Sequence, residues 1–292
     1  MTKIPTGYNL PKNEALNSEM TDQEIKERLL SDFKQQEVKR SDFPTEVVPL
    51  PSRGLLYPQD HPLADGFIEM KYMTAKEEDI LTSQNLIKQG VVLDKLFESM
   101  IVTPVNYNDI YSGDKNAIMI AARLLGYGND YIVEIEDPFS PGDKQKVTID
   151  LSQIEHKEVD YSLFENRKNE FDFELPTSKR VVTFRLMTHG IEKEIQSELK
   201  ATNKTIVKSG IDKELTTRLK YIITSIDGES GRATINNFVD NELFAMDSRA
   251  LRKYMRDMSP DVDMTFTFVS DATGEMKEID IPMDVSFFWP ES

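Results

Sequence analysis

The sequence predicts an α+β protein in which one unit, a strand followed by three helices and a β-hairpin, occurs twice as an internal duplication. An N-terminal extended or helical arm precedes the two copies. Matching elements follow one another in the same order in both parts of the chain, and residues 114–135 align with residues 247–268 without a gap. The length of 292 residues is enough for about two domains of ordinary size.

The first strand of each unit is predicted from alternating apolar residues, which place every second side chain on one face. These residues are Ile68, Met70 and Tyr72 in the first unit and Val182, Phe184 and Leu186 in the second. Each strand leads to a Met-Thr pair, and its threonine, Thr74 or Thr188, is expected to be the N-cap of the first helix. Glu77 completes a capping box in the first unit.

The first helix of each unit is expected to end at a glycine, Gly90 or Gly210, because glycine adopts the left-handed conformation without strain. The second helix is predicted from apolar residues at positions i, i+3, i+4 and i+7, which share one face. These residues are Leu93, Leu96, Phe97 and Met100 in the first unit and Leu219, Ile222, Ile223 and Ile226 in the second. We expect this face to be buried in both units.

The third helix is expected to begin at an aspartate N-cap, Asp114 in the first unit and Asp247 in the second. After each of these helices, two alternating segments separated by a turn predict a β-hairpin. A further candidate strand precedes each unit, so each sheet is also expected to begin with a hairpin. The predicted strands other than those named above are residues 46–50, 131–135, 146–150, 171–175, 264–268 and 278–281.

These elements divide the chain into an N-terminal arm and two repeats. The predicted segments are the arm with its short helix (residues 1–44), the first α+β repeat (45–152), a charged linker (153–169) and the second α+β repeat (170–292). The linker is placed at 153–169 because that stretch is charged and only weakly periodic.

The arm contains one predicted amphipathic helix, at about residues 22–36, in which Ile25, Leu29 and Phe33 recur every four residues. An isolated helix of this length is only marginally stable in water, so it needs a surface to pack on. Two interpretations stay open. The helix packs on its own domain, or Ile25, Leu29 and Phe33 bind a partner protein.

Composition excludes several classes of function. The formal net charge of −16 disfavours binding to nucleic acid or to anionic lipid surfaces. Because the chain has no cysteine, it has no disulfide framework, zinc finger, iron–sulfur cluster or thiol nucleophile. No apolar run is long enough to cross a bilayer, and the N-terminus lacks the apolar stretch of a secretory signal. We therefore expect a soluble protein that is cytosolic when made.

Residues typical of catalysis are few. The chain has three histidines and none of the common nucleophile, phosphate-loop or zinc-protease motifs. His189 is expected to be a surface residue in the first turn of a helix, and Glu134 and Glu136 are expected to lie on a solvated strand face. We expect no enzymatic activity, no cofactor, no metal and no small-molecule substrate.

Aromatic residues gather near the end of the sequence, where Phe287, Phe288 and Trp289 are adjacent and include the only tryptophan. Large apolar side chains are stabilised by about 1.5 to 3 kcal/mol each when they are buried, so this cluster is expected to pack. Two interpretations stay open. The cluster covers the core of the second repeat, or it anchors the chain to another subunit, where aromatic residues commonly dominate the binding energy.

Three segments resemble the T4-type bacteriophage baseplate hub subunit family. They are residues 73–87 (MTAKEEDILTSQNLI), 116–128 (NAIMIAARLLGYG) and 287–290 (FFWP). The resemblance covers residues of about 45 to 292. It implies a structural or assembly protein of a contractile phage tail, located in the virion baseplate and in the host cytoplasm during assembly.

The same resemblance implies that the partners are other baseplate hub, tail tube or tape-measure proteins. An alternative is a transient assembly chaperone that holds a hub or tape-measure protein and then leaves. A carboxylate-based glycosidase that opens the cell wall is a distant third hypothesis, because it would need two carboxylates facing each other across a cleft.

Overall fold

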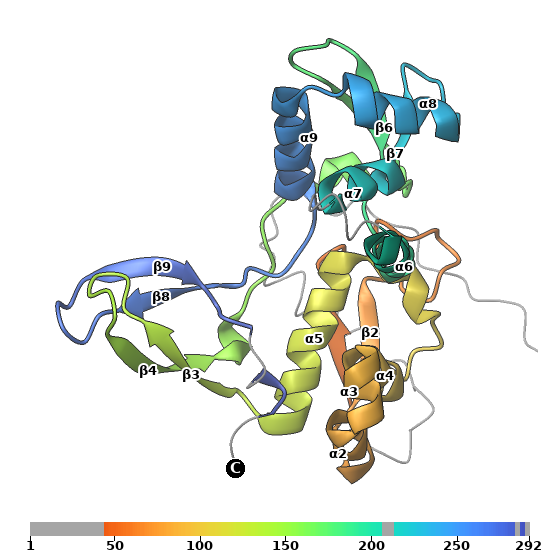
Figure 1. Ribbon diagram of the computed structural model, residues 1–292. Helices are drawn as coiled ribbons and strands as arrows, with labels where there is room; N and C mark the ends of the chain where they lie inside the picture. Colours follow the sequence, from red (N-terminus) through yellow and green to blue (C-terminus); the bar gives the residue numbers. More distant parts are fainter. Residues whose placement is uncertain (1–43, 206–212, 284–286, 290–292) are drawn as a thin grey trace, which may run out of the picture. The chain divides into compact units, whose positions relative to one another are not determined.

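A computed structural model describes residues 44–205, 213–283 and 287–289 of the chain (Figure 1). Helices alternate with small antiparallel sheets, which confirms the α+β prediction. The described residues belong to one compact unit, Phe43–Ser292. The strands are β1 (Thr45–Pro49), β2 (Phe67–Lys71), β3 (Asp130–Glu136), β4 (Lys144–Asp150), β5 (Phe171–Glu174), β6 (Val181–Phe184), β7 (Ile223–Ile226), β8 (Thr265–Val269) and β9 (Met276–Asp280).

The described α-helices lie in the segments that connect the strands. They are α2 (Ala75–Thr82), α3 (Gln84–Gln89), α4 (Val92–Met100), α5 (Ser112–Tyr127), α6 (His189–Thr205), α7 (Glu214–Ile222), α8 (Arg232–Asn237) and α9 (Ala245–Met258). Short 3-10 turns η1 (Tyr107–Asp109), η2 (Leu151–Gln153) and η3 (Tyr161–Phe164), and one π-turn η4 (Phe238–Glu242), complete the described elements.

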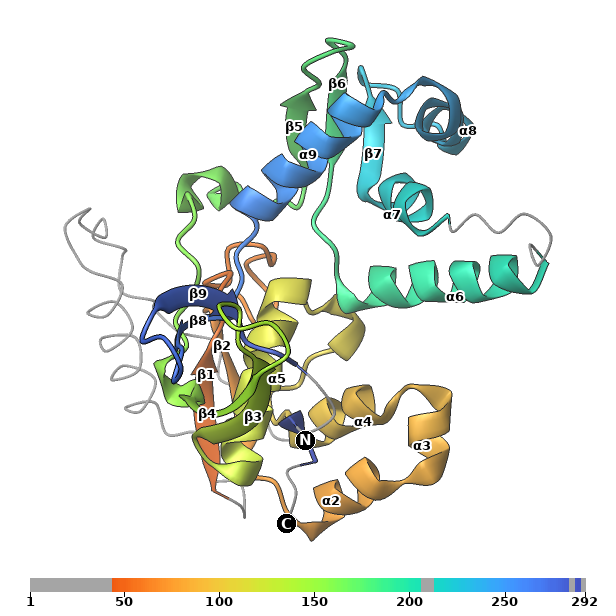
Figure 2. The ribbon, with the colours of Figure 1, turned by 60° about the vertical axis from the view of Figure 1, so that its left-hand side comes forward.

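All strand pairs are antiparallel. β1 pairs with β2, β3 with β4 and β8 with β9, while β6 lies between β5 and β7 (Figure 2). On β2 and β6, Ile68, Met70, Val182 and Phe184 are buried as predicted, but Tyr72 lies beyond the end of β2 and is exposed. Both predicted terminal hairpins, β3–β4 and β8–β9, are present.

The connection between β1 and β2 depends on glycine. Gly54 and Gly66 have φ angles of +75° and +82°, which L side chains rarely adopt. A Cβ atom on Gly54 would lie 2.2 Å from the carbonyl oxygen of Ala64. The connection is therefore closed by direct backbone packing. Arg167 also stabilises the β1–β2 connection, because its guanidinium donates a 3.1 Å hydrogen bond to the carbonyl oxygen of Gly54.

The predicted capping box at Thr74 and Glu77 is confirmed. The carboxylate of Glu77 accepts hydrogen bonds from the backbone N–H of Thr74 at 3.0 Å and from its hydroxyl at 2.6 Å. Gly90 ends α3 with a φ of +71°, as expected. The predicted first helix is divided, however, because Ser83 is extended and ends α2 before α3 begins. The matching Gly210 lies outside the described residues.

The predicted second helix of the second repeat is wrong in its last part. Leu219 and Ile222 lie on α7 as expected, but Ile223 and Ile226 belong to β7. The N–H of Ile223 closes α7 on the carbonyl of Leu219, and the chain then turns extended to pair with β6. Ile101 in the first repeat behaves similarly. It ends α4 in an extended conformation and forms an antiparallel bridge with Met70 of β2.

The predicted aspartate N-caps are also wrong. Asp114 and Asp247 are each the third residue of their helix, and the N-caps are Tyr111 and Phe244. Both carboxylates point instead at the turn of the preceding hairpin. Asp114 accepts from the N–H of Ser52 at 2.9 Å, and Asp247 accepts from the N–H of Thr177 at 2.7 Å and that of Ser178 at 3.0 Å. Each aspartate therefore joins its helix to its sheet.

The two terminal hairpins contact each other through aligned residues. Asp137 follows β3 and Ser270 follows β8, and the hydroxyl of Ser270 donates a 2.5 Å hydrogen bond to the carboxylate of Asp137. Gln145 of β4 adds a bond to the carbonyl oxygen of Val269 at 2.9 Å. Asp137 and Ser270 begin the two turns that the sequence comparison matches, and their hydrogen bond joins the two hairpins. The duplication itself stays a prediction.

Buried apolar side chains from both repeats form one hydrophobic cluster rather than two separate cores. The charged segment 153–169 takes part, because Phe164 is buried and contacts Phe171 of β5 at 5.6 Å between ring centroids. Two short bridges add to this, one between Tyr111 and Thr188 and one between His156 and Val262.

Candidate interaction surfaces

The aromatic residues Phe287 and Phe288 are buried within the chain, with exposed fractions of 1% and 3%. The ring of Phe287 meets that of Tyr131 edge-on at a centroid distance of 5.1 Å, and Phe288 lies 5.8 Å from Phe97. Tyr131 and Phe97 belong to β3 and α4 of the first repeat. The expectation that these rings cover the core of the second repeat is therefore wrong in its location.

Trp289 is half-buried, and its indole N–H donates a 3.1 Å hydrogen bond to the carbonyl oxygen of Leu81 at the end of α2. The hydroxyl of Tyr131 donates in the same region to the carbonyl oxygen of Pro282. These contacts hold the final aromatic segment against the first repeat, so Phe287 and Phe288 are not free to bind another subunit in this conformation. The exposed part of the Trp289 side chain remains available for contact.

The predicted partner-binding residues Ile25, Leu29 and Phe33 lie outside the described residues. Their role stays a proposal.

A polar cluster missed by sequence reasoning surrounds His189. The histidine is buried, contrary to the expected surface position, because its neighbours come from distant parts of the chain. Its Nδ1 lies 3.1 Å from Nζ of Lys115 and its Nε2 lies 3.4 Å from a carboxylate oxygen of Asp94. The ring also packs at 4.5 Å on the ring of Tyr107. Since an ammonium group only donates, Nδ1 accepts from Lys115 and Nε2 carries the proton that faces Asp94.

This cluster binds the two repeats together. Lys115 also contacts a carboxylate oxygen of Glu192 at 3.2 Å, so α4 and α5 are held to α6 by alternating charges. Burial of Asp94 favours its neutral form, but hydrogen bonding to His189 and the nearby charge of Lys115 outweigh it and lower the pKa of Asp94. The arrangement orients and neutralises its members, which suits a structural role.

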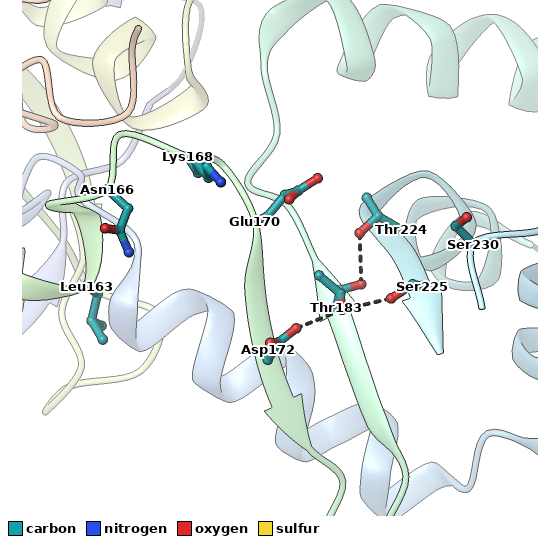
Figure 3. Close-up of a pocket in the computed structure, with 9 residues that line it drawn as sticks. All are labelled: Leu163, Asn166, Lys168, Glu170, Asp172, Thr183, Thr224, Ser225 and Ser230. Carbon is teal, nitrogen blue, oxygen red and sulfur yellow. Dashed lines mark hydrogen bonds between the residues drawn. The ribbon is translucent and has the colours of Figure 1, made fainter. Parts of the chain in front are cut away.

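Two hollows of about 420 Å³ each are present, one along residues 98–107 after α4 and one beside β5, β6 and β7. The one beside β7 is lined mainly by hydroxyl and charged side chains (Figure 3). Within it, the hydroxyl of Thr183 donates to Asp172 at 2.7 Å and accepts from Ser225 at 2.8 Å. Because these polar groups bond to one another across the sheet, they hold its outer face together.

Asp114 is an unusual buried acid. Besides Ser52, the hydroxyl of Tyr57 donates a 2.7 Å hydrogen bond to its carboxylate. Burial nevertheless dominates and raises the pKa of Asp114 to about 6. Asp247 differs, because hydrogen bonds from Thr177 and Ser178 outweigh the effect of burial and lower its pKa. Similar positions in the two repeats thus have opposite electrostatic balances.

Across residues 44–205, 213–283 and 287–289, no group of three or more metal-ligating side chains gathers in a way that could hold an ion. In the same described part of the chain, no helix is long and apolar enough to cross a membrane.

The model of one protein family, described as T4 bacteriophage base plate protein, matches residues 59–289. The chain belongs to this T4 baseplate family. The match includes both terminal hairpins and ends at Trp289, so it takes in the aromatic segment that packs on the first repeat. No curated protein and no solved structure matches the chain.

Membership of the baseplate family assigns the chain to the structural proteins of a bacteriophage baseplate. Its expected place is the tail of the virion, and its expected partners are other structural proteins of the phage. The buried contacts described above join segments that are distant in the sequence.

Proposed function

We propose that the protein is a structural component of the central hub of a contractile-tail baseplate, retained in the virion and acting through protein–protein contacts. The family match over residues 59–289 carries this proposal. The resemblance of residues 73–87, 116–128 and 287–290 to hub subunits adds the finer assignment.

The buried polar side chains support a structural role and not a catalytic one. The side chains with the most unusual surroundings, His189, Asp94, Lys115 and Asp114, are bonded to partners from other elements. A catalytic group must instead be available to a substrate. We infer that these groups hold the repeats in position and that the protein has no enzymatic role.

The N-terminal arm supplies the proposed attachment. In this account Ile25, Leu29 and Phe33 form the apolar stripe of a short helix that docks on a neighbouring hub, tail tube or tape-measure protein. The exposed part of Trp289 would contribute a second contact. These residues stay proposals.

The alternative is an assembly chaperone that binds hub or tape-measure protein and is then released. Quantitative mass spectrometry of purified virions separates the two. A structural component is expected at a constant ratio to other baseplate proteins, while a chaperone is expected in infected-cell extracts and absent from virions. Absence from virions would contradict the structural proposal.

A further inference from the structure

Helices α5 and α9 begin in the same way but in different surroundings. Each has an aromatic N-cap, Tyr111 or Phe244, and each has a buried aspartate as its third residue that binds the preceding hairpin. The two starts are therefore built on one local plan. The start of α5 is further covered by the segments around Met187 and Pro260, whereas Phe244 and Met246 at the start of α9 are exposed.

Backbone packing covers the start of α5. The N–H of Ser112 donates a 3.1 Å hydrogen bond to the carbonyl oxygen of Met187, just before α6. Gly113 lies so close to the segment after α9 that a Cβ atom would be 2.0 Å from the carbonyl oxygen of Pro260. Glycine is required there because any side chain would push the two segments apart.

The part of α5 that is covered by other segments extends one turn beyond Gly113. The side-chain amide of Asn116 donates a 2.9 Å hydrogen bond to the carboxylate of Asp261. Gly113 and Asn116 are three residues apart, so they lie on the same face. This face of α5 is an interface inside the chain.

The same face of α9 is open. The residues that align with Tyr111, Gly113 and Asn116 are Phe244, Met246 and Arg249. Phe244 is 54% exposed and Met246 is 73% exposed, the highest value among the large apolar side chains of the described residues. Gly113 of α5 packs against the carbonyl oxygen of Pro260, whereas the aligned Met246 of α9 exposes a long apolar side chain to solvent.

The open face is also basic. Arg249, Lys253 and Arg256 recur along the stripe that begins at Met246, and all three are exposed. Arg249 has no ion-pair partner within the described part of the chain. A basic stripe is unusual on a chain with a formal net charge of −16, and it fits an acidic partner surface.

We propose that this open face of α9, formed by Phe244, Met246 and Arg249, binds a second copy of the chain head to tail. The contact would use the surface of the first repeat that aligns with the segments covering α5, with the side chain of Met246 packing in place of the close backbone approach at Gly113. In the two repeats, Met73 and Thr74 align with Met187 and Thr188, and Tyr127 and Gly128 align with Pro260 and Asp261.

Met73 packs against the end of α5, which places these two aligned segments next to each other. The N–H of Met73 donates to the carbonyl oxygen of Leu125 at 3.3 Å, and a Cβ atom on Gly126 would lie 2.6 Å from the Met73 side chain. Tyr72, next to it, is 39% exposed. The surface thus combines an aromatic side chain with the apolar end of α5.

Charge favours the pairing. Two exposed acids follow these residues closely in the sequence. They are Glu78 in the first turn of α2 and Asp130 at the start of β3. They can face Arg249 of the other copy, as Asp261 faces Asn116 within one copy. Because the two surfaces differ, the contact is heterologous and would propagate into a ring or a filament. It does not depend on the proposed tail role.

The absence of native cysteine permits a direct test on the full-length chain. Ala75→Cys and Ala245→Cys place thiols at exposed alanines on the two proposed surfaces. Each variant is treated alone and in an equal mixture with a short bis-maleimide. Met276→Cys, exposed on β9, replaces Ala75→Cys in the control mixture.

The expected result is a cross-linked dimer from the Ala75→Cys and Ala245→Cys mixture, with much less product from either variant alone or from the control mixture. Equal yields in the control mixture, or efficient self-linking of Ala245→Cys, would overturn the head-to-tail contact. Sedimentation of Met246→Asp with Arg249→Glu is expected to show about tenfold weaker self-association with unchanged circular dichroism. A chain that stays monomeric at every concentration would overturn the proposal.

Discussion

Phe287→Ala tests whether the final aromatic segment is part of the folded core. The side chain is 1% exposed and lies 5.1 Å from the ring of Tyr131 and 5.0 Å from that of Phe288. Truncation of a buried phenylalanine to alanine costs about 3 to 5 kcal/mol, which combines lost transfer energy with the cavity left behind. We expect the full loss because the ring is buried and packs edge-on with two aromatic partners, Tyr131 and Phe288.

The assay is equilibrium unfolding in urea, followed in parallel by far-ultraviolet circular dichroism and by tryptophan fluorescence. Trp289 is the only tryptophan, so its emission reports the docking of this segment directly. If the segment belongs to the cooperative unit, the two signals change at the same urea concentration. Trp289→Phe is the matched control, followed by circular dichroism alone because it removes the only tryptophan; it loses mainly one hydrogen bond to Leu81 and is expected to cost about 1 kcal/mol.

Two results would refute this reasoning. One is an unchanged unfolding midpoint for Phe287→Ala. The other is a solvent-exposed emission spectrum of Trp289 in the native wild-type protein. Either would mean that the segment is undocked in solution and free to act as an anchor.

Further predictions concern acids, a close contact and the arm. Asp114 has a folded pKa of about 6, above the ~3.9 of an unfolded aspartate, so the folded state binds more protons and unfolding free energy should rise by about 1 kcal/mol from pH 7 to pH 5. Asp114→Asn should abolish this rise in urea titrations at the two pH values. Asp247→Asn should cost about 1 to 3 kcal/mol in the same assay, because an amide N–H would face a backbone N–H; an unchanged midpoint would contradict this. Gly113→Ala should destabilise by about 1 to 3 kcal/mol by forcing a Cβ against Pro260, and calorimetry showing no loss would mean that the contact is loose. Deletion of residues 1–40 should leave the thermal midpoint nearly unchanged and weaken partner association in pull-downs, whereas a large drop would place the arm in the core.

Local patterns predicted the strands and hairpins well. Alternation along β3 placed Glu134 and Glu136 on a solvated face, as observed. Such patterns depend on side-chain period alone, so they can be found without knowing which element lies opposite.

A change from helix to strand was harder to predict where no glycine or proline marks it. Ile222 and Ile223 are adjacent, but the first ends α7 and the second begins β7. Apolar spacing fits either element there, and pairing with β6 decides the outcome. The run of β-branched residues Ile222, Ile223 and Thr224 was the available signal, since such residues favour strands.

The polar cluster could not be predicted from the sequence. His189 is buried because Tyr107, Asp94 and Lys115 reach it from the first repeat. Likewise, the aromatic character of Phe287 and Phe288 predicted that they pack on an apolar surface, but not that Phe97 and Tyr131 provide it. Contacts between distant segments depend on topology, which residue spacing does not contain.

The most direct test of the baseplate account is the position of the chain in the virion. A functional, epitope-tagged copy is expressed during infection, and purified virions are labelled with gold and viewed by electron microscopy. The account predicts label at the tail end distal to the head, and in isolated baseplates at their centre. Label along the tail or on the head, or no label on virions that contain all other baseplate proteins, would contradict it.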